Sequence, residues 1–191
     1  MLGKAAVAMW WDVAPEVRAE WEEWHTVEHM PERLSIPGFL RGSRWVSDGA
    51  YFVLYEVAEL ETITAGPYLE RLNHPTPWSR KMMPHHRNMV RSLCLVRASY
   101  GDGLPGAMAT VRFSSGHADL PGGKGITNAH LLEAQPMPGV TEEQKIRGGD
   151  ATAAWVLLVG GYDAAAVERA APQLAGATRG LYRLSYSLAR T

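Results

Sequence analysis

The sequence predicts an α+β protein made of two β-α-β-β-α-β units in one chain, the second of them degenerate. Two observations lead to this fold class. Apolar, strand-like stretches alternate with stretches rich in helix formers along the 191 residues. In addition, a linker rich in Gly and Pro at residues 101–106 divides the chain nearly in half. We therefore expect a first unit at residues 1–100 and a second at residues 107–191.

The first unit opens with an apolar stretch, residues 4–13, that predicts a strand. A run of good helix formers follows at residues 16–29, and Pro15 suits the first turn of that helix. Pro31 disfavours helical geometry at the residue before it. We therefore expect the helix to end near Met30.

The rest of the first unit reads as a hairpin, a broken helical region and a last strand. Residues 39–47 and 51–58 predict two strands joined by an Asp-Gly turn. Residues 60–86 predict two short helices, because prolines interrupt the region. Residues 89–98 alternate in polarity and complete the unit as its fourth strand.

The second unit repeats this order in reduced form. Strands are expected at residues 108–114 and 126–134, and the short Gly- and Pro-rich segment between them leaves little room for a first helix. Residues 136–150 read as an exposed loop. The remaining predicted elements are a strand at 153–159, a helix at 163–175 capped by Asp163, and a strand at 181–188.

A β-α-β-β-α-β unit of the ferredoxin-like type covers one face of its sheet with helices and leaves the other face bare. Two such units in one chain can bury their bare faces against each other, sheet to sheet. This arrangement explains strands that are apolar on both sides, such as residues 154–159. We expect a monomer, or a homodimer if edge strands pair with a second copy.

Composition and charge exclude several classes of protein. With 46% hydrophobic and 20% charged residues and a formal net charge of -1, long disorder and a polybasic surface are excluded, so nucleic acid is not an expected partner. The single cysteine cannot form an intrachain disulfide. No stretch reaches the roughly 20 apolar residues of a membrane span, and the early apolar run is too short for a signal peptide. We expect a cytoplasmic protein without a membrane partner.

One part of the first unit resembles a known family. Residues 24–33 read Trp-His-Thr-Val-Glu-His-Met-Pro-Glu-Arg, residues 36–40 read Ile-Pro-Gly-Phe-Leu, and Arg44 follows in the next strand. This pattern is similar to the EthD-like members of the dimeric α/β-barrel superfamily. The resemblance implies an internal dimeric α/β barrel. It leaves the activity open, because the superfamily includes polyketide cyclases, lactone isomerases, cofactor-free monooxygenases and haem enzymes.

The candidate catalytic residues lie on and after the first predicted helix. Glu28 falls on the apolar stripe of that helix, where a carboxylate needs a partner. His25 is the local candidate, and a structural pair with Arg33 or Arg44 is the alternative. His29 lies in the expected last turn, where exposed carbonyls favour a cation, so we expect it to be protonated readily unless it only caps the helix.

These positions suggest roles in acid–base chemistry. His29 is predicted as the proton donor or acceptor and His25 as its relay. Glu28 would orient and charge the imidazole, and Arg44 would stabilise an oxyanion. We predict no metal. Residues 25–29 match the H-x-x-E-H zinc pattern, but a zinc hydrolase of that kind needs a third ligand on a separate helix and a larger scaffold.

Aromatic side chains concentrate in the first unit, where six of the seven tryptophans precede residue 100. Tryptophans often only fill cores, but this density predicts a cavity walled by rings and suited to an aromatic ligand. The predicted substrate-binding residues are Trp10, Trp24, Trp45, Tyr55, Tyr68, Trp78 and His85. In the haem-binding branch of the superfamily a histidine from this general region ligates iron, so His85 or His86 is a minor haem candidate.

The sequence therefore predicts a cofactor-independent acid–base enzyme, namely a cyclase, isomerase, dehydratase or lyase. Its substrate would be a small hydrophobic carbonyl or aromatic compound. Three alternatives stay open: a non-catalytic module that binds a small hydrophobic metabolite, a haem-binding or monooxygenase-type barrel, and an accessory protein whose interior is filled by its own side chains.

Overall fold

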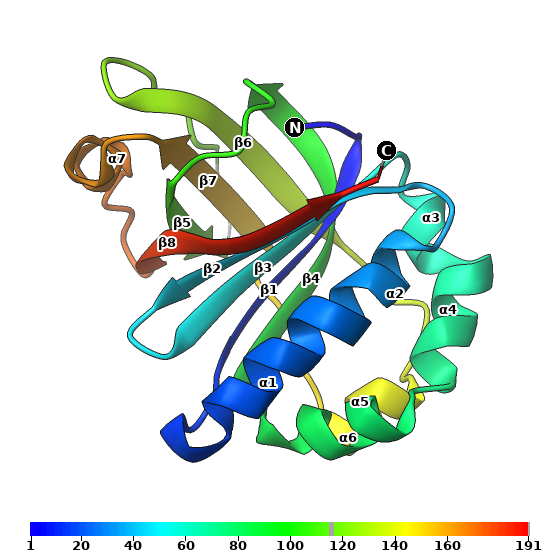
Figure 1. Cartoon of the computed structure of the whole chain (residues 1–191). Coiled ribbons are helices and arrows are strands. Elements are labelled where there is room, and N and C mark those ends of the chain that lie inside the picture. The colour runs from blue at the N-terminus through cyan, green and yellow to red at the C-terminus, as the bar shows by residue number, and fades with distance from the viewer. Residues whose placement is uncertain (115–116, 191) are drawn as a thin grey trace.

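The structure, a computed structural model, describes residues 1–114 and 117–190. Its centre is a closed barrel of eight strands in the order β1-β3-β2-β8-β5-β7-β6-β4 (Figure 1). Every neighbouring pair is antiparallel. The strands are β1 (Ala5–Asp12), β2 (Phe39–Ser47), β3 (Ala50–Val57), β4 (Arg87–Tyr100), β5 (Ala107–Phe113), β6 (Ile126–Gln135), β7 (Trp155–Gly161) and β8 (Thr178–Ala189).

The two halves of the chain have the same strand order. The first four strands lie side by side as β4-β1-β3-β2, and the last four as β8-β5-β7-β6. The halves are joined where β2 pairs with β8 and β4 pairs with β6. The sequence predicted two sheets packed face to face. In the structure the edge strands of the two sheets are also hydrogen-bonded to each other. This closure pairs the edge strands that would otherwise be open to another chain.

The helices cover the two sides of the barrel unequally (Figure 1). Those of the first half, together with α6, lie over the outer face of the first four strands, whereas α7 packs on β5 and β7. The helices are α1 (Arg18–Trp24), α2 (Met30–Leu34), α3 (Glu61–Thr64), α4 (Gly66–Asn73), α5 (Pro77–Met82), α6 (Glu142–Arg147) and α7 (Ala164–Ala170). Short 3-10 turns precede α1 at Pro15–Val17 and follow α5 at Met83–His85.

The sequence predicted that the first helix ends near Met30, but in the structure the helical path continues beyond it. A π-helical turn at His25–His29 connects α1 directly to α2, and the helical path continues to Leu34. Pro31 lies in the first turn of α2, immediately after the π turn. A proline ring would clash with a carbonyl four residues earlier in a regular α-helix, and the wider π turn accommodates it.

Three further predictions of helices need correction. Residues 136–150 are not simply an exposed loop, because they contain α6, which starts with a capping box between Thr141 and Gln144. Residues 60–86 form three short α-helices and a 3-10 turn rather than two helices. The last helix is shorter than predicted, although Asp163 caps it as expected through a bond from the Ala166 amide.

Buried apolar residues form three clusters, and the strands contribute to more than one of them. The first fills the barrel and includes Trp10, Trp45 and Phe52. The second, which we call the first helix layer, lies between the helices of the first half and the sheet and includes Trp21 and Trp24. The third, the α7 layer, lies under α7. Strands buried on both faces explain the continuous apolar runs of the sequence.

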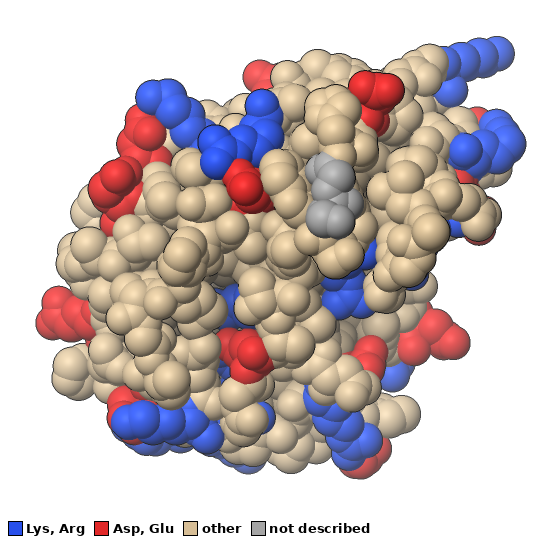
Figure 2. All heavy atoms as spheres, turned by 180° about the vertical axis from the view of Figure 1, so that it is seen from behind, with Lys and Arg blue, Asp and Glu red and all other residues tan. Residues whose placement is uncertain are grey.

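Charged side chains of both signs are interspersed on the face shown in Figure 2, where most of the surface is formed by other residues. Among the described residues, no helix is long and apolar enough to cross a membrane.

Candidate functional site

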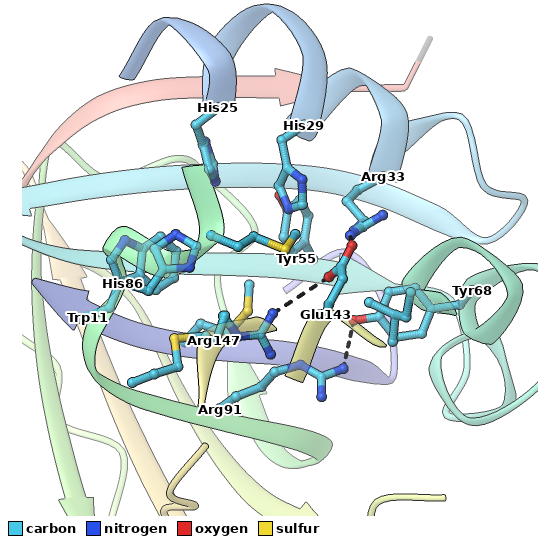
Figure 3. Close-up of a pocket in the computed structure, with 14 residues that line it drawn as sticks. Trp11, His25, His29, Arg33, Tyr55, Tyr68, His86, Arg91, Glu143 and Arg147 are labelled. Atoms are coloured by element: carbon cyan, nitrogen blue, oxygen red, sulfur yellow. Dashed lines mark hydrogen bonds and ion pairs between the residues drawn. The ribbon is translucent and has the colours of Figure 1, made fainter. Parts of the chain in front are cut away.

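A narrow cavity lies in the first helix layer, between the helices and the outer face of the sheet (Figure 3). Its free volume of about 20 Å³ has room for roughly one water molecule. Histidines, arginines and methionines dominate its wall. The lining residues are Met9, Trp11, His25, His29, Arg33, Tyr55, Tyr68, Leu72, Met83, His86, Met89, Arg91, Glu143 and Arg147.

Three imidazoles face this cavity. His25 and His29 are the two ends of the π turn, and their ring centres lie 5.5 Å apart. They point from the helix toward the cavity in Figure 3, where His86 is seen beside Trp11. His25 is 1% exposed and His29 is 8% exposed. π-helical turns occur frequently at functional sites, because they change which side chains share a face.

The tautomer of His86 follows from one hydrogen bond. The indole Nε1 of Trp21 donates to His86 Nε2 at 2.9 Å, so that nitrogen is an acceptor. Neutral His86 therefore carries its proton on Nδ1, which is buried and has no partner among the residues that the structure describes. This residue presents an unused donor beside the other two imidazoles.

All three imidazoles are held in the neutral form. Burial, followed by the positive charge of Arg33, lowers the pKa of His29 well below its usual value. Burial also lowers the pKa of His25 strongly, with Arg44 adding to the effect, and that of His86, with Arg147 adding to it. The expectation that His29 is protonated readily is therefore wrong. Its helix continues past it, so no exposed carbonyls are there to favour a cation.

Buried polar atoms without a hydrogen-bond partner cluster at this cavity. Besides His86 Nδ1, they include Nδ1 of His25 and of His29, the hydroxyl of Tyr55 and Nε1 of Trp11. Burial raises the pKa of Tyr55 far above its usual value, so its hydroxyl keeps its proton. Each unsatisfied buried group costs about 1–3 kcal/mol. A polar molecule in the cavity would satisfy several of them at once.

One wall of the cavity comes from the second half of the chain. Glu143 of α6 forms a buried ion pair with Arg33 of α2. Its other oxygen lies 3.6 Å from Arg147, and Arg147 also pairs with Asp150 at 2.7 Å. Burial alone would lower the pKa of Arg33, but Glu143 together with Tyr68, Glu32 and Tyr55 outweighs it, so the pKa lies above its usual value. The helix α6 is therefore attached to the first helix layer by charge.

The structure brings together four of the predicted site residues, His25, His29, Tyr55 and Tyr68. Glu28 is not with them. Its carboxylate accepts hydrogen bonds from the Thr76 hydroxyl at 2.6 Å and from the Trp24 indole at 3.2 Å. Glu28 therefore contacts neither the imidazole that it was expected to orient nor the arginines of the structural alternative.

Arg44 and three other predicted residues lie near the cavity without lining it. Arg44 donates to Ser185 at 3.0 Å and lies under the ring of Trp21. Trp24 packs on the His29 ring, with ring centres 4.6 Å apart. Trp78 donates to Glu20 at 3.2 Å. His85 is the neighbour of the histidine that does line the cavity.

Trp10 and Trp45 lie inside the barrel, on the other side of the sheet. Trp10 donates to Thr110 at 3.2 Å, and Trp45 donates to the carbonyl of Pro105 at 3.2 Å. Consecutive residues of a strand point to opposite faces, so Trp10 and Trp11 could not both line one pocket. That alternation was the signal that would have identified Trp11.

Sequence reasoning also missed Arg91, Glu143 and Arg147. Arg91 lies on a strand that was predicted correctly, but its face was not assigned. The other two belong to α6, which has no apolar stripe to mark it. His86 had been considered only as a haem ligand.

In the described part of the chain, neither the H-x-x-E-H residues nor His85 and His86 form the metal or haem site considered for them. Among the described residues, no group of three or more His, Cys, Asp or Glu is placed to hold a metal ion. A haem would need a free histidine and a wide slot. Nε2 of His86 is engaged by Trp21, His85 does not line the cavity, and the free volume suits a water molecule.

No family model and no curated protein matches this sequence. Solved structures do match its fold. An anthrone oxidase-like protein aligns with a TM-score of 0.60 at 13% identity, over 97% of this chain and 93% of that one. A protein from Fusobacterium nucleatum described as a "putative monooxygenase" aligns with a TM-score of 0.60 at 9% identity, over 100% and 96%.

A second "putative monooxygenase", from Lactobacillus acidophilus, aligns with a TM-score of 0.52 at 7% identity, over 95% of this chain and 93% of that one. At these identities the likeness is one of fold alone. The chain shares the fold of these proteins, and its own fold is a closed eight-stranded α+β barrel.

Proposed function

We propose that this protein is a cofactor-independent acid–base enzyme that removes a proton from a small hydrophobic carbonyl or aromatic compound. We further propose that it is an EthD-like barrel of two ferredoxin-like repeats, acting in the cytoplasm as a monomer or homodimer. The observation that carries the proposal is the group of neutral, buried imidazoles with unpartnered nitrogens around one cavity.

His29 is the proposed base. Its neutral imidazole takes a proton from a carbon next to a carbonyl, and the electron pair of the broken C–H bond moves into the carbonyl to give an enolate. The protonated Tyr55 hydroxyl is available to donate a hydrogen bond to the enolate oxygen. Because burial and Arg33 disfavour the imidazolium, it returns its proton readily, to another carbon in an isomerase or to a leaving group in a lyase.

The size of the cavity sets a condition for this role. A carbonyl compound larger than water enters only if side chains move. Three methionines, Met9, Met83 and Met89, line the cavity. Methionine is unbranched and adapts its shape at little cost, so these side chains are suited to make room.

A second candidate is favoured by the names of the structural neighbours, an anthrone oxidase-like protein and two monooxygenases. The same proton removal would give a carbanion that reacts with dioxygen. A methylene compound R₂CH₂ and O₂ would then yield the ketone R₂C=O and H₂O, by way of a hydroperoxide that loses water. Dioxygen is the oxidant, and the chain again supplies the base.

Deuterium exchange tests the proposed function. 2-Indanone and anthrone, both with acidic C–H bonds, are incubated in D₂O and followed by ¹H NMR. We expect the protein to accelerate exchange and His29→Gln to lose most of the acceleration, whereas His74→Gln, at an exposed position outside the cavity, keeps it. Exchange that is no faster than in buffer, or unchanged in His29→Gln, would overturn the proposal. Dioxygen uptake with anthrone separates the second candidate from the first.

A further inference from the structure

Arg91 is a buried cation at the cavity without a carboxylate partner in the described part of the chain. It lies on β4, is 2% exposed and lines the cavity from the strand side, across from His25 and His29 (Figure 3). One guanidinium nitrogen donates to the Tyr68 hydroxyl at 2.9 Å, and another contacts the sulfur of Met137 at 3.5 Å. Neither partner carries a negative charge.

The other two arginines of the cavity are compensated. Arg33 pairs with Glu143 and with Glu32, and Arg147 pairs with Asp150 and approaches Glu143. The wall of the cavity thus holds three guanidinium groups and a single carboxylate. An arginine cannot discard its proton, and a buried charge without a counter-ion is costly. Arg91 is therefore the cation of this site that lacks a counter-ion in the described part of the chain, and a bound anion would supply one.

We infer that the cavity binds a ligand bearing a carboxylate, and that Arg91 is the residue that binds this group. The inference rests on the proposed function and narrows its substrate class to small carboxylic acids with an apolar or aromatic body. The planar guanidinium matches the two oxygens of a carboxylate. Tyr68, whose oxygen accepts from Arg91, can donate its own proton to the same group.

The arrangement also gives the ligand a direction. Its carboxylate lies at Arg91 on the sheet, so its remaining atoms extend toward His25 and His29 on the helix. If the ligand also has a carbonyl group at its other end, the carbon next to that carbonyl would lie close to His29, the proposed base. Arg91 is in this sense a binding residue, and the imidazoles act at the other end of the molecule.

Isothermal titration with benzoate and benzamide, which are similar in shape and differ in charge, tests the inference. We expect benzoate to bind at least roughly tenfold tighter than benzamide, and Arg91→Met to abolish that difference. Arg97→Met is the matched control, because Arg97 lies on the same strand but is partly exposed and paired with Glu133. It should keep the preference. No benzoate preference in the wild type, or an equal loss in both variants, would overturn the inference.

The stability of the ligand-free protein gives a second measurement. Replacing an unpaired buried charge and its hydroxyl partner by apolar residues is expected to leave the melting temperature unchanged or raised, so Arg91→Met/Tyr68→Phe should be at least as stable as the wild type. A fall of roughly 5 °C or more would show that Arg91 is structural. If benzoate is not preferred but His29 still controls exchange on 2-indanone, this inference alone fails. If benzoate is preferred but His29→Gln does not change exchange on 2-indanone, only the proposed function fails.

Discussion

The first helix layer and the α7 layer lie against sheets of the same strand order, yet their cores differ in polarity. Under α7 the outward-facing buried residues of β5 and β7, such as Val111, Leu157 and Val159, are apolar. Under the helices of the first half, three imidazoles, three guanidinium groups and a carboxylate surround a cavity. The α7 layer shows that apolar packing alone can cover such a sheet. The polar groups of the first layer therefore do more than cover the sheet, and the ligand proposed above would satisfy those that have no partner among the described residues.

The two layers also differ in how far their polar groups are satisfied. Five of the buried atoms without a hydrogen-bond partner, in Trp11, His25, His29, Tyr55 and His86, belong to residues that line the cavity of the first layer. Leaving such atoms unpaired lowers the free energy of unfolding. The first half thus gives up more stability than the second, where Asn128 Oδ1 is the one such atom among the described residues, and a loss of this kind is common at active sites.

The largest effect expected from this contrast is on activity. His29→Gln should lower the rate of proton exchange by roughly 10²–10⁴, because one positioned imidazole contributes about that factor. Leu157→Ala, in the α7 layer, should leave the rate per folded molecule unchanged. Exchange rates measured on both variants, with the folded fraction from circular dichroism, make the comparison. A similar loss of rate in Leu157→Ala would show that the halves are not functionally distinct.

Acid should destabilise the protein mainly through the first layer. The pKa values of His25, His29 and His86 are lowered in the folded state, whereas unfolded histidine titrates near about 6.5. Below that pH the unfolded chain binds protons that the folded protein does not. The free energy of unfolding should therefore fall by up to about 1.4 kcal/mol per pH unit for each of these histidines.

Urea unfolding at pH 5.5 and 7.5 measures this dependence. His25→Gln should reduce the slope by about one proton, whereas His74→Gln, on the surface, should leave it unchanged. In the second half His130, whose pKa is lowered to about 3 by burial and by the N-terminal amine and Arg41, adds a single such group. A stability that is flat across this range would mean that the three imidazoles are not buried in the neutral form.

The barrel could be predicted from the sequence because its strands are marked by simple patterns. Residues 153–159 are an apolar run that corresponds to β7, and residues 126–134, a mixed stretch between a Gly-rich segment and Pro136, correspond to β6. Closure at β2–β8 and β4–β6 left no such mark, since pairing between distant strands depends on register rather than composition. The helix α6 was missed because its buried side chains include Glu143 and Gln144, which have the pattern of a surface loop.

The site was only partly predictable for the same physical reason. His25 and His29 were found because their spacing on one helix is visible in the sequence. Glu28 was placed with them by a regular helical wheel, but its side chain turns to Thr76 instead. Arg91 and Arg147 come from other elements, and the sequence contains no local signal that brings them to these histidines.

Stability itself should respond differently in the two layers. Leu157→Ala should cost about 2–5 kcal/mol, because Leu157 is fully buried in the α7 layer and its loss leaves a cavity. Tyr55→Phe, in the first layer, should be near neutral or stabilising, since its hydroxyl has no partner in the described part of the chain. Urea unfolding of both variants tests the difference. A loss of more than about 2 kcal/mol in Tyr55→Phe would contradict it, by showing that the hydroxyl is satisfied.

The smallest effect concerns α6, the part of the second half that reaches the first layer. Thr141→Ala removes the capping box and should lower the free energy of unfolding by about 1 kcal/mol. Asp163→Ala removes the cap of α7 and should cost a similar amount. The two helices differ in their relation to the cavity. Glu143 of α6 lines the cavity and pairs with Arg33, whereas no residue of α7 lines it. Only Thr141→Ala should therefore also slow the proton exchange that depends on His29, and equal rates in the two variants would show that α6 is a cover rather than part of the site.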